Sequence, residues 1–290
     1  MTTSGTDTMN VRLALTPHDL RRRRVNRVMI RSIRITAILS IIPLLAIVAL
    51  VISKGLPGLN LSFLFNSPLS EPAGIINAIQ GSLVITLVAT IASAPIGIAG
   101  GIYLNEYASN RVASLGEVII DVMLGVPSIL AGLFAYFAIV PIVGHSGWAA
   151  AIALSVLMIP VVMRTTQEVL RLVPSGLREA SLALGVSRWK TTLLITCRTA
   201  LSGIMTGVVL AISRGLGETA PLLLTSQSSN DTAINLGHPM SAMTVVIYNN
   251  AGSSDPQIVA QAWTTALVLF VIALILNVSV RFKTVNNRVV

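Results

Sequence analysis

The chain has 290 residues, of which 53% are hydrophobic and only 11% are charged, and its formal net charge is +9. Soluble domains carry roughly 25% charged residues, so this composition excludes an ordinary soluble protein and indicates one embedded in a membrane. Cys197 is the only cysteine, which excludes an intrachain disulfide.

Residues 1–34 are polar and basic, and the first apolar stretch follows them directly. They carry eight arginines, which are Arg12, Arg21, Arg22, Arg23, Arg24, Arg27, Arg31 and Arg34. Arginine clusters bind nucleic acid or anionic lipid, but they also precede first transmembrane helices on the cytoplasmic side. We expect a cytoplasmic segment beside membrane lipid, with no nucleic-acid partner and no cleaved signal peptide.

Six apolar stretches are candidates for transmembrane helices. They cover residues 35–52, 83–104, 118–143, 148–163, 203–224 and 262–280. Pro127 falls inside the third stretch, and the fourth is short. We therefore expect an all-α membrane protein with a six-helix permease domain over residues 35–281 and a tail over residues 282–290.

The basic residues predict how this domain is oriented. With the N-terminus inside, 18 of the 20 lysines and arginines fall on the cytoplasmic side, and only Lys54 falls outside. Arg214 lies within a span, and residues 225–261 contain neither lysine nor arginine. The positive-inside rule therefore predicts cytoplasmic termini in a multi-pass protein of the cytoplasmic membrane.

The fifth span, residues 203–224, carries the charged pair Arg214 and Glu218. Its small residues, Gly203, Gly207, Ala211 and Gly215, share a helix face with Glu218, and Arg214 lies at the edge of that face. An ionisable side chain in hydrocarbon costs ~2.5–3.5 kcal/mol on insertion scales. This face should therefore look into a helix bundle or a wet pathway.

The guanidinium of Arg214 offers a planar set of donors that matches an oxyanion. Glu218 either neutralises Arg214 when no substrate is bound, or accepts the proton that hydrogen phosphate carries and sulfate lacks. We assign Arg214, Glu218 and Thr219 to a substrate pathway.

A hinge is expected beside this pair. Pro221 cannot donate a hydrogen bond to the carbonyl of Gly217, and Gly215 and Gly217 loosen the same turn. Bending at this point would suit a pathway that opens to each side in turn.

Two loops separate the last three spans. In the inner loop, residues 164–198, Pro174 ends one helix and Ser175 can cap a short amphipathic helix that stops at Gly185. Its apolar side chains suggest a docking partner. The outer loop, residues 225–261, is either covering structure or a docking surface for an external partner, and its length favours docking.

Two acidic residues lie near the predicted cytoplasmic ends of spans. Asp121 is expected to be a charge at a helix end, and Glu106 is expected to face the cytoplasm.

The inner loop resembles the EAA motif of ABC-importer permeases, with Glu179, Ala180, Gly185 and Ile195 at the motif's spacing. The resemblance implies that residues 175–190 dock on a separate ATPase and pass its closure to the transmembrane helices. It assigns this coupling to Glu179, Ala180, Leu184 and Gly185. Cys197 and Arg198 stand where the family usually has Leu-Pro, so the local helix kink does not carry over.

Four further segments resemble the PstA-type inner-membrane permeases of bacterial phosphate importers: GGIYLNEYA at 100–108, DVMLGVPSILAGLF at 121–134, SRGLGETAPLL at 213–223 and VIYNNAGSSDP at 246–256. The resemblance implies a type I ABC importer permease fold and a heterodimer with a PstC-type subunit. It also implies a homodimeric PstB-type ATPase, which binds ATP and Mg, and an external phosphate-binding protein.

No Walker loop, paired-histidine metal spacing or Gly-x-Ser-x-Gly elbow occurs in the sequence. We therefore expect a transport subunit with no catalytic site, metal or cofactor of its own. Two alternatives stay open. One is the same machine built for sulfate or molybdate, since arginine binds every oxyanion. The other is a non-transporting scaffold or signalling subunit, against which the coupling helix argues.

Overall fold

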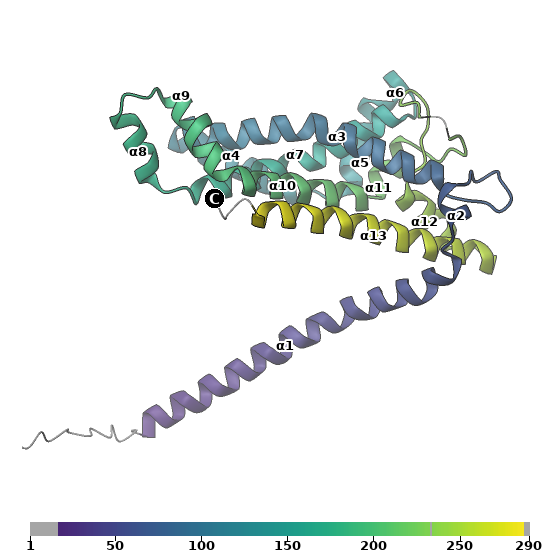
Figure 1. Cartoon of the computed structure of the whole chain (residues 1–290), viewed down its shortest axis with the longest axis horizontal. Helices are drawn as coiled ribbons and strands as arrows, with labels where there is room; N and C mark the ends of the chain where they lie inside the picture. Colours follow the sequence, from purple (N-terminus) through teal and green to yellow (C-terminus); the bar gives the residue numbers. More distant parts are fainter. Residues whose placement is uncertain (1–16, 233, 287–290) are drawn as a thin grey trace, which may run out of the picture. The chain divides into compact units, whose positions relative to one another are not determined.

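A computed structural model describes residues 17–232 and 234–286, and all of their regular structure is helical (Figure 1). The helices are α1 Pro17–Gly55, α2 Leu61–Phe65, α3 Ile76–Ile102, α4 Asn110–Gly125, α5 Ser128–Ala138, α6 Val140–Val143, α7 Gly147–Arg171, α8 Ser175–Ala183, α9 Arg188–Lys190, α10 Cys197–Gly217, α11 Ala220–Thr225, α12 Met243–Ala251 and α13 Pro256–Asn286. Arg12 and Arg288, which belong to the predicted terminal segments, lie outside the described residues.

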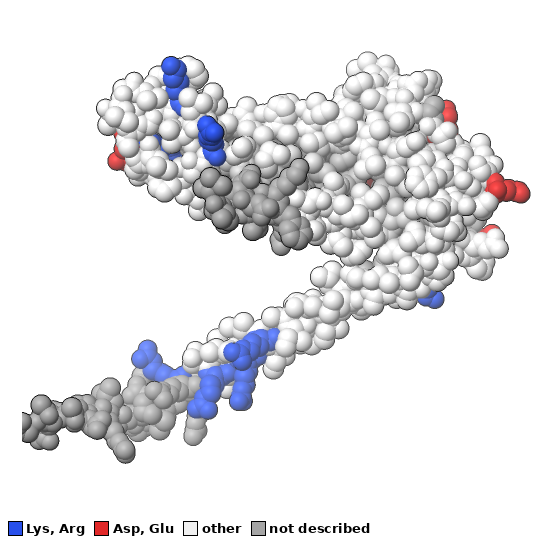
Figure 2. All heavy atoms as spheres, viewed as in Figure 1, with Lys and Arg blue, Asp and Glu red and all other residues white. Residues whose placement is uncertain are grey.

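The chain forms two units, residues 1–50 and residues 51–290. The described part of the first unit belongs to one helix, α1, which starts in the basic segment and continues through the first predicted span. In the second unit, lysine and arginine side chains gather around α8 and α9 (Figure 2). We call this the α8 end of the bundle; α2, α6 and α12 lie at the opposite end, the α12 end (Figure 1).

Five helical segments in the described residues are long and apolar enough to cross a membrane, and α4 with α5 supplies a sixth if this bent pair is one span. The prediction of six apolar spans agrees with this count. Helices are the expected solution, because a helix satisfies its backbone hydrogen bonds internally where lipid offers none.

The third span is bent at the proline that the sequence placed inside it, and the bend is a complete break between two helices. Helix α4 ends at Gly125, α5 begins at Ser128, and their axes differ by 94°. Proline lacks an N–H and disfavours helical backbone in the residue before it, and Val126 is accordingly extended. Pro127 therefore breaks this span.

Several helices extend beyond the predicted spans, and α7 and α13 are two of them. Helix α7 continues past Met163 to Arg171, shortly before Pro174, where the sequence predicted that a helix ends, and Arg164 forms an i,i+4 ion pair with Glu168 at 2.9 Å within this extension. Helix α13 begins at Pro256, six residues before the expected start. Proline is well tolerated in a first helical turn, which makes it a favourable starting residue.

Helix α7 is the centre of the bundle. It is contacted by α3, α4, α5, α10 and α11. About two thirds of the residues in its most apolar stretch are buried. Small side chains allow this close approach, since Ala149, Ala150 and Ala153 are fully buried beside Leu154 and Met158.

The outer loop, residues 225–261, folds back onto the bundle and contains α12. The amide of Met243 donates a 2.8 Å hydrogen bond to Ser82 Oγ of α3, and Asn77 Nδ2 donates to the carbonyl of Ser229 at 2.7 Å. Ser226 Oγ bonds the backbone of Met240. Part of this loop is therefore covering structure, and docking of an external partner on its exposed part stays a prediction.

Candidate functional site

The short helix expected in the inner loop is α8, Ser175–Ala183. Ser175 does not cap it, because Ser175 is already its first helical residue and no side chain caps the start. The prediction that this helix stops at Gly185 is confirmed. Gly185 has a φ of +79°, a left-handed conformation that glycine adopts without a steric penalty, and its amide bonds the carbonyl of Leu182.

The outward side of α8 is apolar and uncovered within the described residues. Leu177 and Leu182 are exposed, and Leu184, just after the helix, is 84% exposed. Glu179, Ala180 and Gly185 are exposed as well, so all four residues assigned to coupling reach the surface. The inward side is polar, where Ser181 and Thr191 share a buried 2.8 Å hydrogen bond.

An exposed aromatic residue that the sequence analysis missed lies near this surface. Trp189 in α9 is exposed, and its ring lies 5.6 Å from the Lys190 ammonium. Exposed aromatic side chains are enriched at protein interfaces. The sequence could have indicated a role for Trp189, because it lies in the inner loop that carries the EAA motif.

The fifth span is broken at its charged pair. Helix α10 ends at Gly217, Glu218 has an extended backbone (φ −75°, ψ 132°), and α11 starts at Ala220. The expectation of one helix through residue 224 is therefore wrong. Pro221 lies in the first turn of α11, where a missing N–H is harmless. The interruption falls between Gly217 and Pro221, and a hinge at these residues stays a prediction.

Arg214 and Glu218 are paired across this break. The Nε of Arg214 lies 3.5 Å from Oε1 of Glu218, and their side chains are 38% and 14% exposed. Thr219, the third residue assigned to the pathway, is half-buried between the two helices. The three residues are thus together at an interruption of the helix.

The small residues of α10 serve packing within this chain. A Cβ at Gly203 would collide with Val169 and one at Gly207 with Thr165, both on α7. Arg214 lies to the side of this contact, on the exposed surface with Leu210 and Gly217. The guanidinium therefore faces outward from this chain's own bundle, which corrects the expectation that the charges and the small residues point together.

A second polar contact, which the sequence analysis did not identify, joins α4 to α7. Glu117 and Asp121 of α4 form ion pairs with Arg171 and Arg164 of α7, the second at 3.6 Å. The expectation that Asp121 is a charge at the start of a helix is therefore wrong, because α4 begins at Asn110 and Asp121 lies well inside it, paired with Arg164. The i,i+4 spacing of the two acidic residues was the only sequence signal.

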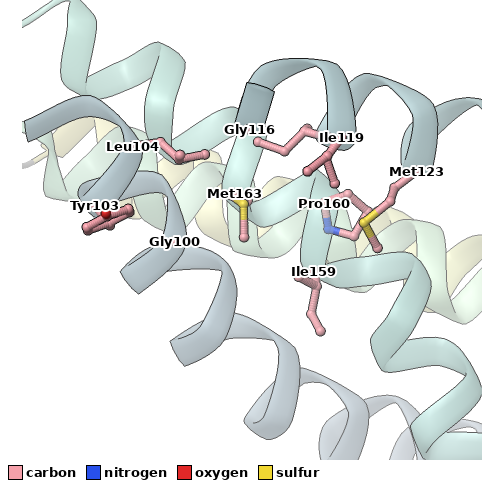
Figure 3. A pocket seen from close by; sticks show the side chains of 10 residues that line it. Gly100, Tyr103, Leu104, Gly116, Ile119, Met123, Ile159, Pro160 and Met163 are labelled. Atoms are coloured by element: carbon pink, nitrogen blue, oxygen red, sulfur yellow. The ribbon is translucent and has the colours of Figure 1, made fainter. Parts of the chain in front are cut away.

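Beside this contact, α3, α4 and α7 line an open apolar pocket of about 280 Å³ (Figure 3). Its lining residues include Tyr103, Ile119, Met123, Pro160 and Met163. None of its lining residues carries a charge.

Comparisons with known proteins agree with this arrangement. A profile of the family described as "Binding-protein-dependent transport system inner membrane component" matches residues 97–284. The phosphate transport system permease protein PstA of Haemophilus influenzae is 40% identical over 264 residues, which cover 90% of this chain and 94% of that protein. PstA of Yersinia pestis is 39% identical over 90% of both chains, and PstA 1 of Mycobacterium tuberculosis H37Rv is 34% identical over 94% of this chain and 92% of that protein.

Solved structures show a similar fold. A chain of the MetNI methionine ABC transporter in an inward-facing conformation has a TM-score of 0.58 at 17% identity and covers 72% of this chain and 94% of its own. A chain of an amino acid ABC transporter has a TM-score of 0.52 at 16% identity, with coverage of 73% and 94%. At such identities the likeness concerns the fold alone.

Proposed function

Because this chain belongs to the binding-protein-dependent transport system inner membrane components, as a PstA-type permease with the type I ABC importer fold, we propose that it carries inorganic phosphate across the cytoplasmic membrane. ATP hydrolysis takes place on a separate ATPase, which holds the ATP and Mg, while an external binding protein delivers phosphate. The partners are a PstC-type permease subunit and a homodimeric PstB-type ATPase.

The observation that carries this proposal is the uncovered apolar surface of α8. Leu184 is 84% exposed and Trp189 is also exposed, at an end of the bundle where basic side chains gather. Basic residues favour the cytoplasmic side, and an apolar surface in water is stabilised by a partner that covers it. We therefore place the α8 end in the cytoplasm and the ATPase against α8.

The position of Arg214 supports a pathway shared between two permease subunits. Its guanidinium lies in a membrane-spanning segment but on the outside of this chain's own bundle. A charge facing lipid would be strongly unfavourable, so this surface suits a water-filled pathway closed by the PstC-type subunit. There Arg214 contacts the phosphate, and Glu218 neutralises it between substrates.

Uptake by the full complex in proteoliposomes tests this function. We expect labelled phosphate to accumulate only with ATP at the α8 side and binding protein at the other side, and unlabelled phosphate to compete far better than sulfate or molybdate. Preferred uptake of sulfate or molybdate would contradict the substrate. ATP hydrolysis without any uptake would contradict the transport function and favour a scaffold or signalling subunit.

A further inference from the structure

Glu106 lies in a π-helical turn, Tyr103–Tyr107, at the α8 end of α3. The sequence predicted that it faces the cytoplasm, but its side chain is only 10% exposed. Its Oε1 accepts a 2.8 Å hydrogen bond from Nη2 of Arg178 and a 2.7 Å hydrogen bond from Nδ2 of Asn105. Glu106 is therefore a nearly buried carboxylate with a charged partner 72 residues away in sequence.

Arg178 belongs to α8 and joins three segments. Besides Glu106, its guanidinium donates to the carbonyls of Leu170 at 2.8 Å and Val173 at 3.1 Å, at the end of α7. Nη2 donates to both Glu106 and Leu170, and Nη1 donates to Val173, an arrangement that the several N–H donors of a planar guanidinium allow. The inward side of α8 is thus tied to the ends of both α3 and α7.

A second set of contacts ties the same turn of α3 to the segment after α8. Arg188 donates to the carbonyl of Glu106, and its guanidinium lies 5.1 Å from the centre of the Tyr107 ring. The hydroxyl of Tyr107 donates to Thr192 Oγ1 at 3.2 Å. The segments on both sides of Gly185 are therefore attached to residues 106 and 107.

The hydrogen bond between Tyr107 and Thr192 joins two π-helical turns. Thr192 lies in the π-helical turn Thr191–Thr196, through which the segment after α8 enters α10. Such π-helical turns are rare and often occur at functional sites. Two of them facing each other would allow α3 and α10 to adjust together when α8 moves.

We propose that Glu106 is a positioning residue for transport, and that its ion pair with Arg178 transmits movement of α8 to α3. This inference rests on the proposed function, in which α8 docks on the ATPase. Covalent connections already carry movement from α8 to α7 and α10. The Glu106–Arg178 pair adds α3, a transmembrane helix with no direct chain connection to α8.

The test measures phosphate transported per ATP hydrolysed by the full complex in proteoliposomes. For Glu106→Gln, which keeps the shape but removes the charge, we expect normal assembly and basal ATP hydrolysis. The ratio should fall about tenfold, the effect of losing one charge-assisted hydrogen bond. Glu106→Asp should retain much of the ratio, and the control Glu168→Gln, at an exposed ion pair on α7, should match the original protein.

Three outcomes decide the matter. If Glu106→Gln lowers the melting temperature and reduces uptake and hydrolysis in proportion, leaving the ratio unchanged, the role is structural and the inference is wrong. If the ratio is normal in Glu106→Gln while Ala180→Trp on the outward side of α8 uncouples, only the inference fails. If Ala180→Trp also couples normally, the docking role in the proposed function fails.

Arg178→Lys decides the question if Glu106→Gln does not assemble. Lysine keeps the positive charge, but its single nitrogen cannot hold Glu106 and the two α7 carbonyls in the same geometry. A reduced ratio with normal basal hydrolysis would support the inference, and an unchanged ratio would overturn it.

Discussion

The hydroxyl of Thr244 donates a 2.9 Å hydrogen bond to the backbone carbonyl of Glu218, at the point where α10 stops. Glu218 is extended there, so its carbonyl cannot be satisfied by the regular helical pattern. A residue just inside α12 satisfies it instead. A hydrogen bond from the outer loop therefore stabilises the break in the fifth span beside Arg214.

Arg214 and Glu218 can be tested together. Arg214→Gln should abolish most uptake, partly because it leaves the 14% exposed carboxylate of Glu218 without its cation. The double variant Arg214→Gln with Glu218→Gln removes that secondary effect. We expect it to assemble and hydrolyse ATP but not to transport phosphate in proteoliposomes. Full recovery of uptake would show that the two residues form only an internal ion pair.

The outward side of α8 should be needed for coupling and dispensable for folding. Leu184→Asp should weaken association with the ATPase about tenfold or more, since burying a leucine contributes roughly 1.5–3 kcal/mol. Leu69→Asp is the matched control, because Leu69 is also strongly exposed and lies in the turn before α3. Co-purification and coupled uptake give the answer; equal behaviour of both variants would contradict docking.

The orientation of the chain can be measured by cysteine labelling in a Cys197→Ser background. Ser187 and Asn230 are both exposed, the first after α8 and the second in the outer loop. In intact cells an impermeant maleimide should label Asn230→Cys and leave Ser187→Cys unlabelled until the membrane is opened. The reverse pattern would overturn the placement of the α8 end in the cytoplasm.

The contact between α10 and α7 predicts a stability effect at Gly207. A Cβ there would collide with the side chain of Thr165, so Gly207→Ala should lower the free energy of unfolding by about 1–3 kcal/mol. No atom lies within 4 Å of a Cβ at Gly125, so Gly125→Ala should be neutral or slightly stabilising. Thermal unfolding of the purified complex measures both, and equal melting temperatures would contradict this packing.

The sequence by itself determined the class of the protein, the number of apolar spans and the loop that carries the short helix α8. These features depend on hydropathy and motif spacing, which are local properties that add along the chain. The stop at Gly185 also belongs here, because a left-handed residue at the end of a helix is a local requirement that glycine meets.

Only the tertiary structure decided where α10 ends, which way Arg214 faces and what Glu106 holds. The sequence pattern around Gly217 allows either a continuous helix or a break, and Thr244, 26 residues later, supplies the hydrogen bond that supports the break. From the sequence, Glu106 was expected only to face the cytoplasm. In the folded protein it is nearly buried, because Arg178 of α8 lies beside it and forms an ion pair with it. Burial and pairing depend on neighbours that are distant in the chain, and therefore no local pattern contains them.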